Sequence, residues 1–164
     1  MQQEILGVDI GGVIIDRVND NTDTSFFKDK YLESTAVPGA LEAIKRLGAE
    51  RFGGRVFLVS KCKAKTEERT RQWLAHRNAY EFLGILPEHV NYCRERQDKA
   101  PICKRLGITH FVDDKLEVLS YLTSVENRFL FNPVEKEVQK FAQYLPNVRR
   151  VETWDDILKE LLPR

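Results

Sequence analysis

The segment Ile5-Leu6-Gly7-Val8-Asp9-Ile10-Gly11-Gly12-Val13-Ile14-Ile15 gives the clearest indication of the fold class. It starts as a short apolar run, reaches a single acidic residue, and passes at once into a Gly-Gly turn. The run is short, is β-branched at Ile5 and Val8 and is interrupted by glycine, a pattern that predicts a buried strand rather than a helix. An open α/β sheet presents its functional groups where its strands end. Asp9 is therefore the first candidate for a functional residue.

Further along the chain, short apolar runs alternate with longer amphipathic segments. Strands are expected at 55–60, 90–93, 109–112, 128–131 and 148–151. Helices are expected at 26–32, 40–47, 66–80, 101–106, 116–122, 134–144 and 154–162, and the polar segment 16–25 is expected to be an exposed loop. Such alternation is typical of βαβ units and predicts a mainly parallel sheet covered on both faces. Since no linker or repeat divides the sequence, we predict a single domain over residues 1–164.

The composition is that of an ordinary globular protein, with 42% hydrophobic and 31% charged residues among 164. The net charge of +1 gives no field that would attract nucleic acid or a membrane, so neither is an expected partner. No apolar run approaches the roughly 20 residues needed to cross a bilayer. The N-terminus lacks the basic region of a signal peptide, and a cytoplasmic location is the expectation.

Three cysteines, Cys62, Cys93 and Cys103, are widely spaced and form no C-x-x-C pair. An odd number at this spacing argues against a disulfide framework or a zinc knuckle. We expect buried free thiols that act as small core residues.

Polar side chains follow three of the predicted strands. Asp9, Ser60 and the Asp113-Asp114 pair stand at strand ends, and Lys99 lies just before a predicted helix. Because the carboxyl ends of parallel strands share one edge of the sheet, we expect these groups to converge. Oxygen ligands of this kind suit Mg²⁺ together with a substrate phosphate. Lysine and serine would then hold phosphate oxygens while the Asp9 carboxylate attacks phosphorus as a covalent nucleophile.

The order of these groups resembles the four motifs of the haloacid dehalogenase (HAD) superfamily. An apolar run ending in D-x-G-G-V, then a strand ending in Ser, then Lys, then a strand ending in Asp-Asp follow one another over roughly residues 4 to 131. The resemblance implies an α/β fold, a Rossmann-like three-layer α/β/α sandwich with a mainly parallel sheet. It also implies a phosphorylated substrate and Mg²⁺ as the cofactor.

The resemblance implies roles for individual residues. Asp9 matches the nucleophile, which is also a direct Mg²⁺ ligand, and Lys99 matches the lysine that steadies nucleophile and phosphate. Asp113 and Asp114 match the acidic fourth motif, with Asp114 favoured as the direct metal ligand. The backbone carbonyl of Gly11 stands where the family takes a further metal ligand.

Phosphate binding is expected at the neighbouring motif. Ser60 matches the phosphate-binding hydroxyl of the family, and Lys61 and Gly12 complete the expected phosphate-binding set. Lys61, directly after Ser60, also competes with Lys99 for the role of the motif lysine, as does Lys104. A solvent-exposed lysine is the alternative for each of them.

Two departures from the family pattern stand out. The phosphatases of the family usually carry a second aspartate two residues after the nucleophile, as general acid and base, and here that position is Gly11. Asp16 and Asp20 in the next segment are candidate substitutes. The gaps 16–54 and 61–98 lack room for a full cap domain, so an open site is expected, which goes with large substrates or with closure by a second subunit in a homo-oligomer.

Three functions compete. The leading one is a Mg²⁺-dependent hydrolase that cleaves a phosphate ester through an aspartyl-phosphate at Asp9. The second is a catalytically impaired HAD-fold protein that binds a phosphorylated ligand or a protein partner. The third rests on Asp9-Ile10-Gly11-Gly12, which resembles the phosphate-binding turn of sugar kinases in the actin-like ATPase superfamily, but that fold needs two domains and usually has Thr where this chain has Val13.

Overall fold

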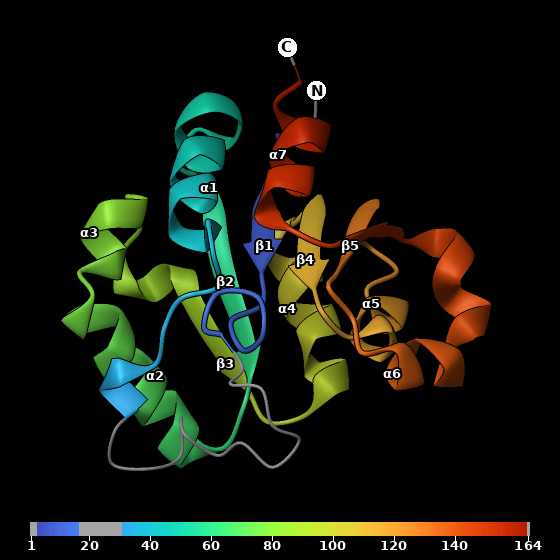
Figure 1. Ribbon diagram of the computed structural model, residues 1–164, viewed down its shortest axis with the longest axis horizontal. Helices are drawn as coiled ribbons and strands as arrows, with labels where there is room; N and C mark the ends of the chain where they lie inside the picture. The colour runs from blue at the N-terminus through green and yellow to red at the C-terminus, as the bar shows by residue number, and fades with distance from the viewer. Residues whose placement is uncertain (1–2, 17–30, 164) are drawn as a thin grey trace.

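The computed structural model, which describes residues 3–16 and 31–163, is built on one six-stranded parallel sheet (Figure 1). The strand order is β3-β2-β1-β4-β5-β6. The strands are β1 (Leu6–Val8), β2 (Val56–Lys61), β3 (Val90–Cys93), β4 (His110–Asp113), β5 (Asn127–Phe131) and β6 (Arg149–Val151). The six predicted strand positions are thus confirmed, and so is the parallel sheet.

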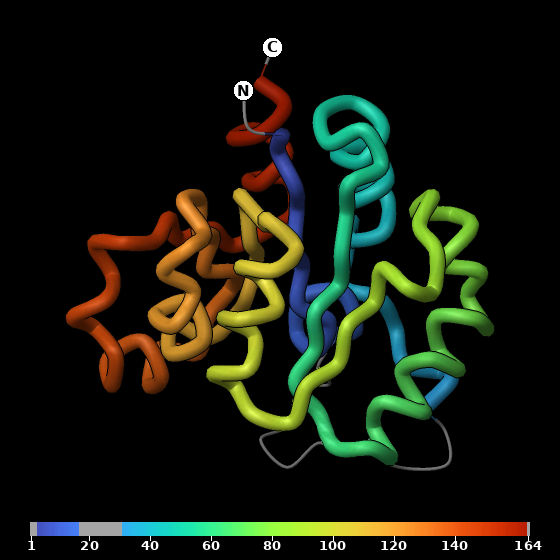
Figure 2. The backbone as a smooth tube through the Cα atoms, turned by 180° about the vertical axis from the view of Figure 1, so that it is seen from behind, coloured from blue at the N-terminus to red at the C-terminus, as the bar shows by residue number. Residues whose placement is uncertain are grey.

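Helices cover both faces of this sheet, which confirms the three-layer α/β/α arrangement. Core residues from α1, α2, α3 and α7 pack on one face, and core residues from α4, α5 and α6 pack on the other, which is turned toward the viewer in Figure 2. The helices are α1 (Ala40–Leu47), α2 (Ala64–His76), α3 (Ala79–Leu83), α4 (Lys99–Leu106), α5 (Leu116–Tyr121), α6 (Glu135–Lys140) and α7 (Trp154–Leu161). Shorter helical turns are η2 (Tyr31–Glu33), η3 (Gly48–Phe52), η4 (Pro87–His89), η5 (Arg96–Asp98) and η6 (Ala142–Asn147).

Strand β1 lies inside the sheet, between β2 and β4, and its residues pack on both faces. Leu6 and Val8 are completely buried in the core under α1 and α7. Gly7 faces the other side, where the ring of Phe111 occupies the space that a side chain would need. The strand order reverses at β1, since β2 and β3 lie on one side of it and β4, β5 and β6 on the other. In sheets of this type the reversal opens a crevice at the carboxyl ends of the strands.

Two predicted helices are shorter than the sequence pattern indicates. The helix expected at 66–80 is divided into α2 and α3 at Asn78, whose φ of 53° is left-handed. Asparagine tolerates this conformation better than most residues, and it ends the helix. The helix expected at 134–144 stops at Lys140, because Phe141 at φ −118° is outside the helical range. Most of the segments expected at 16–25 and 26–32 lies outside the described residues.

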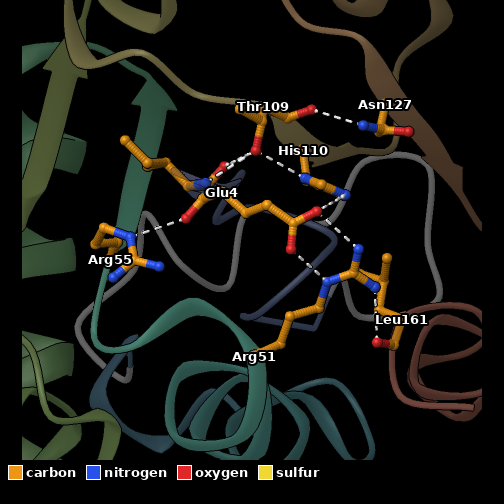
Figure 3. Close-up of polar contacts among 8 residues, drawn as sticks. Glu4, Arg51, Arg55, Thr109, His110, Asn127 and Leu161 are labelled. Carbon is orange, nitrogen blue, oxygen red and sulfur yellow. Dashed lines mark hydrogen bonds and ion pairs between the residues drawn. The ribbon is translucent and has the colours of Figure 1, made fainter. Parts of the chain in front are cut away.

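A network of polar contacts lies at the amino edge of the sheet, near both chain termini (Figure 3). Arg51 donates from Nε and Nη2 to the two carboxylate oxygens of Glu4, each at 2.9 Å, and from Nη1 to the carbonyl of Leu161 at 2.8 Å. Arg55 Nε donates to the Glu4 carbonyl at 3.0 Å. The network therefore joins the segment before β1 to the end of α7.

The described helices include no segment of the length and apolar character that crossing a membrane would require.

Candidate active site

Parallel pairing of β1 with β4 brings Asp9 beside Asp113. The register pairs Val8 with Val112, and the Asp9 N–H donates to the Val112 carbonyl at 2.9 Å, which extends the ladder by one residue. Both carboxylates therefore leave the sheet at its carboxyl edge, at the point where the strand order reverses. In open α/β sheets this is the position at which ligands generally bind.

Lys99 lies between these two carboxylates. Its side chain is only 2% exposed, and Nζ lies 2.9 Å from Asp9 Oδ1 and 2.9 Å from Asp113 Oδ2. Burial alone would lower the pKa of Lys99, but the charges of Asp113 and Asp9 outweigh it and raise that pKa well above its usual range. The lysine therefore stays protonated and joins the ends of two strands through one ammonium group. Lys61 and Lys104, its competitors in the sequence, are both exposed.

Asp113 is the most enclosed member of the acidic set, with 1% of its surface exposed. Burial raises the pKa of its carboxyl group, and the nearby Asp9 charge raises it further, while Lys99 acts in the opposite direction. Its Oδ1 accepts the N–H of Lys115 at 3.0 Å, and its Oδ2 accepts from Lys99. Both oxygens of Asp113 are thus held in place by the protein.

Asp9, Asp113 and Asp114 form the acidic cluster in which a cation would fit. One carboxylate oxygen from each lies within 4.8 Å of the others, and all three residues are buried. Asp9 and Asp113 share the Lys99 ammonium group, and Asp114 adds a third carboxylate to the cluster. Mg²⁺ prefers such oxygen ligands, completed by water and substrate phosphate. The donor set therefore fits the metal that the motifs imply.

Ser60 and Lys61 end the neighbouring strand β2. The register pairs Val8 of β1 with Leu58, so Ser60 lies one position beyond the neighbour of Asp9. Ser60 is 7% exposed, while Lys61 is exposed at the same edge. Strand β2 thus ends with a buried serine and an exposed lysine at the same edge of the sheet as Asp9 and Asp113, and their phosphate-binding roles stay predictions.

The turn after Asp9 supplies backbone rather than side chains. Gly12 has a φ of 81°, and its N–H donates to the Ile15 carbonyl at 2.9 Å, so this amide is already used within the turn. Within residues 3–16 and 31–163, a Cβ atom added to Gly11 would meet nothing closer than 4 Å. The position that holds the second aspartate in the HAD phosphatases is therefore open space. Of the candidate substitutes, Asp16 is exposed and Asp20 lies outside the described residues.

Glu137 on α6 is a residue that the sequence did not indicate. Its two carboxylate oxygens accept the N–H groups of Leu116 and Glu117, each at 2.9 Å. These are the first two residues of α5, which is separated from the Asp113-Asp114 pair only by its N-cap residue Lys115. Glu137 thus fixes the helix start that follows the acidic pair. In the sequence it looks like one of several charged residues on a solvated helix, and no local signal marks it.

The cysteines behave as expected. Cys62, Cys93 and Cys103 are all buried and free. Burial raises the pKa of each thiol, to about 11 for Cys93 and about 12 for Cys103. The three cysteines are therefore buried core residues. The raised pKa keeps each thiol in its protonated form, which is much less reactive than the thiolate.

Comparison with known proteins supports the architecture. No protein-family model matches the chain. A putative nucleotidase of Oceanobacillus iheyensis is 27% identical over 132 residues, which are 80% of this chain and 64% of that protein. The chain thus spans less than two thirds of the length of this relative.

Two solved structures share the fold. A HAD family hydrolase from Deinococcus radiodurans, with bound phosphate and sodium, superposes with a TM-score of 0.68 at 13% identity, covering 98% of this chain and 95% of that one. D,D-heptose 1,7-bisphosphate phosphatase from Burkholderia thailandensis gives a TM-score of 0.57 at 17% identity, covering 99% of this chain and all of that one. The resemblance indicated by the four motifs is therefore confirmed at the level of architecture: this chain has the fold of the HAD family hydrolases.

Proposed function

We propose that this protein is a Mg²⁺-dependent hydrolase that cleaves a phosphorylated substrate through an aspartyl-phosphate on Asp9. The observation that carries the proposal is the buried Lys99 ammonium, 2.9 Å from both Asp9 and Asp113, with Asp114 completing a cluster of oxygen donors. This is an arrangement of fixed charges around one carboxylate. Such charges stabilise a transferring phosphoryl group when they point at the place where negative charge develops.

Each residue has a distinct part in this proposal. Asp9 Oδ2 attacks phosphorus, while Lys99 holds Oδ1 and keeps the carboxylate oriented. Asp9, Asp114 and the Gly11 carbonyl would hold Mg²⁺, with Asp113 beside them. Ser60 and Lys61 at the end of β2 would bind phosphate oxygens. The cation, when bound, would offset the charge of the phosphate as it approaches three carboxylates.

The comparisons support phosphate chemistry in general. The curated relative is described as a putative nucleotidase, and the solved neighbours are a phosphatase and a hydrolase with phosphate bound. These descriptions belong to those proteins, and nucleoside monophosphates therefore enter only as one group of substrates to be tested.

The test is a turnover assay with a panel of phosphate compounds, with Mg²⁺ and with EDTA. We expect phosphate release that needs Mg²⁺ and disappears in Asp9→Asn. Acid-quenched protein should carry one phosphoryl group, located at Asp9 by peptide mass spectrometry. Turnover that survives in Asp9→Asn would remove Asp9 as the nucleophile.

The second candidate is a protein that binds a phosphorylated ligand or a protein partner without efficient turnover. Gly11 favours it, because proton transfer by a positioned side chain commonly contributes about 10²–10⁴-fold to a rate. Phosphate binding that depends on Mg²⁺ and Asp114, with no turnover and no phosphoryl group on Asp9, would support this candidate over the first.

A further inference from the structure

The groups around Asp9 are arranged to hold charge in place rather than to deliver a proton. Lys99 is 2% exposed, and its ammonium is directed at Asp9 and Asp113 from inside the protein. Asp113 uses Oδ2 for Lys99 and Oδ1 for the N–H of Lys115. Neither side chain can turn toward a departing group without breaking these contacts.

The turn beside the nucleophile adds no proton donor. Gly11 and Gly12 have no side chains, and Ile10 before them is buried and apolar. A Cβ atom at Gly11 would have no neighbour within 4 Å among the described residues, so these residues leave the space open and the backbone uncrowded. Among residues 3–16 and 31–163, the side chains in contact with Asp9 and those of the turn after it thus provide no general acid.

We propose that the substrates of this site are phosphates with an acidic leaving group, namely acyl phosphates and aryl or enol phosphates, rather than alkyl phosphates. This inference rests on the proposed function. In the first step an Asp9 oxygen forms a bond to phosphorus, and the bond between phosphorus and the leaving oxygen breaks. The electron pair stays on that oxygen. A carboxylate, phenolate or enolate is stable with this pair, whereas an alkoxide needs a proton that neither Lys99, Asp113 nor the turn after Asp9 supplies.

The second step, hydrolysis of the aspartyl-phosphate, lacks a general base just as the first step lacks a general acid. Water attacks phosphorus of the aspartyl-phosphate, the bond to the Asp9 oxygen breaks, and the carboxylate is restored. The proton of the attacking water must pass to solvent, because Gly11 offers no base. With an acidic leaving group, the first step therefore outruns the second, and phosphorylated Asp9 accumulates.

The experiment compares leaving groups of different acidity on the full chain with Mg²⁺. Acetyl phosphate and p-nitrophenyl phosphate represent acidic leaving groups, and glycerol phosphate and a nucleoside 5′-monophosphate represent alkoxides. We expect kcat/KM for the first pair to exceed that for the second by more than the 10²–10⁴-fold that general acid catalysis usually supplies. Pre-steady-state release of p-nitrophenol should show a burst of about one equivalent per chain, the fingerprint of a covalent intermediate.

Two substitutions at Gly11 form a matched pair. Gly11→Asp places a carboxyl group in the open space. It should lower the ratio of kcat/KM for acidic leaving groups to kcat/KM for alkoxide leaving groups by about 10²–10⁴-fold, mainly by raising the rates for alkyl phosphates. It should also remove the burst. Gly11→Asn has nearly the same size without the acid and should do neither. Asp9→Asn gives the uncatalysed background for each substrate.

The possible failures are distinguishable. Alkyl phosphates cleaved as fast as acetyl phosphate by the parent would overturn this inference, and would leave the proposed hydrolase standing with a proton donor from elsewhere in the chain. Equal effects of Gly11→Asp and Gly11→Asn would overturn it as well. If no substrate is cleaved and acetyl phosphate leaves Asp9 unlabelled, the proposed function itself fails, and this inference fails with it.

Discussion

Lys99 Nζ lies 2.9 Å from Asp9 Oδ1, although 90 residues separate the two in sequence. The same nitrogen lies 2.9 Å from Asp113 Oδ2, so one ammonium group joins the ends of β1 and β4 through the start of α4. The contact is almost completely enclosed, with 2% of the Lys99 side chain exposed. A charge pair in such surroundings cannot lose one member without leaving the other unsolvated.

Lys99→Met should therefore be strongly destabilising. It leaves two buried carboxylates facing each other without a cation, and breaking a buried pair in this way typically costs about 3–5 kcal/mol. The free energy of unfolding should be measured in urea, in EDTA so that no divalent cation replaces the lysine. Lys104→Met, on the same helix but exposed, is the control and should stay within about 0.5 kcal/mol of the parent. Equal stability of the two variants would contradict this interpretation of the cluster.

Glu137 should control metal affinity without touching the metal. Its carboxylate holds the N–H groups of Leu116 and Glu117 and so fixes the backbone that follows Asp114. Residues that orient metal ligands typically contribute 10–100-fold to affinity, and we expect Glu137→Ala to weaken Mg²⁺ binding by about that much. Isothermal titration with Mg²⁺ measures this directly and needs no substrate.

The controls separate positioning from general stability. Glu137→Gln keeps one acceptor oxygen and should recover part of the affinity. Glu135→Gln, on the same helix, removes only an exposed ion pair with Arg150 and should leave Mg²⁺ binding unchanged. If Glu137→Ala unfolded more easily but bound Mg²⁺ as tightly as the parent, Glu137 would stabilise α5 only and would have no role in metal binding.

The architecture could be predicted from the sequence because its signals are local. Each strand is a short apolar run, and polar residues such as Asp9, Ser60 and Asp113 stand where the runs end. Parallel strands share one carboxyl edge, so the convergence of these residues follows from the topology alone. The same logic placed Lys99 at the site, although the sequence could not separate it from Lys61 and Lys104. The three lysines differ in burial, because only the Lys99 side chain enters the protein between Asp9 and Asp113, while Lys61 and Lys104 are exposed.

Other features depend on contacts that no local pattern records. Glu137 caps a helix on a neighbouring segment, and its own surroundings in the sequence look like a solvated surface. Asn78 divides a helix because it adopts a left-handed conformation, although the charged pattern continues past it. The joining of Glu4 to α7 through Arg51 needs two chain ends to meet at the amino edge. In each case the tertiary structure overrides a locally consistent pattern.

A methyl group should destabilise the protein at Gly7 but not at Gly11, two glycines of the first motif. A Cβ at Gly7 would lie 2.6 Å from Phe111 Cδ2 and 2.8 Å from Ile108 Cδ1, so Gly7→Ala must displace a fully buried ring. Overpacking of this kind typically costs about 1–3 kcal/mol. A Cβ at Gly11 would meet nothing within 4 Å in the part of the chain that the structure describes, and Gly11→Ala should change stability by less than about 0.5 kcal/mol.

Thermal and urea unfolding of the two alanine variants test this contrast. The double variant Gly7→Ala/Phe111→Leu should lose less stability than the sum of the two single changes, because the smaller side chain makes room for the methyl group. Strict additivity would show that Phe111 is not the residue that excludes a side chain at Gly7. A large loss in Gly11→Ala would show that the open space beside Asp9 is filled in the folded protein.

His110 should make the protein less stable in mildly acidic solution. Its side chain is buried at the amino edge, where Nδ1 lies 2.8 Å from Thr109 Oγ1 and Nε2 lies 3.9 Å from Glu4 Oε2 (Figure 3). Burial lowers the pKa of His110; the Glu4 charge opposes this shift, and the Arg51 charge adds to it. The folded protein therefore keeps the imidazole neutral at a pH where the unfolded chain, with a pKa of about 6.5, binds a proton. The unfolded state binds more protons in this window, so the free energy of unfolding falls as the pH is lowered from about 6.5 toward the folded pKa.

Unfolding free energies measured in urea at a series of pH values from 7.5 downward check this effect. His110→Gln should reduce the slope of stability against pH just below pH 6.5, apart from any uniform loss caused by removing the ring from its edge-on contact with Phe52. His76→Gln, at an exposed position on α2, should leave the slope unchanged. The side-chain hydrogen bond from Arg51 lowers the pKa of Glu4, and the loss of that contribution begins only below the ordinary glutamate pKa of about 4.3, so it falls outside the window. If His110→Gln and the parent showed parallel pH profiles between 6.5 and 5, His110 would not be the group that takes up the proton on unfolding.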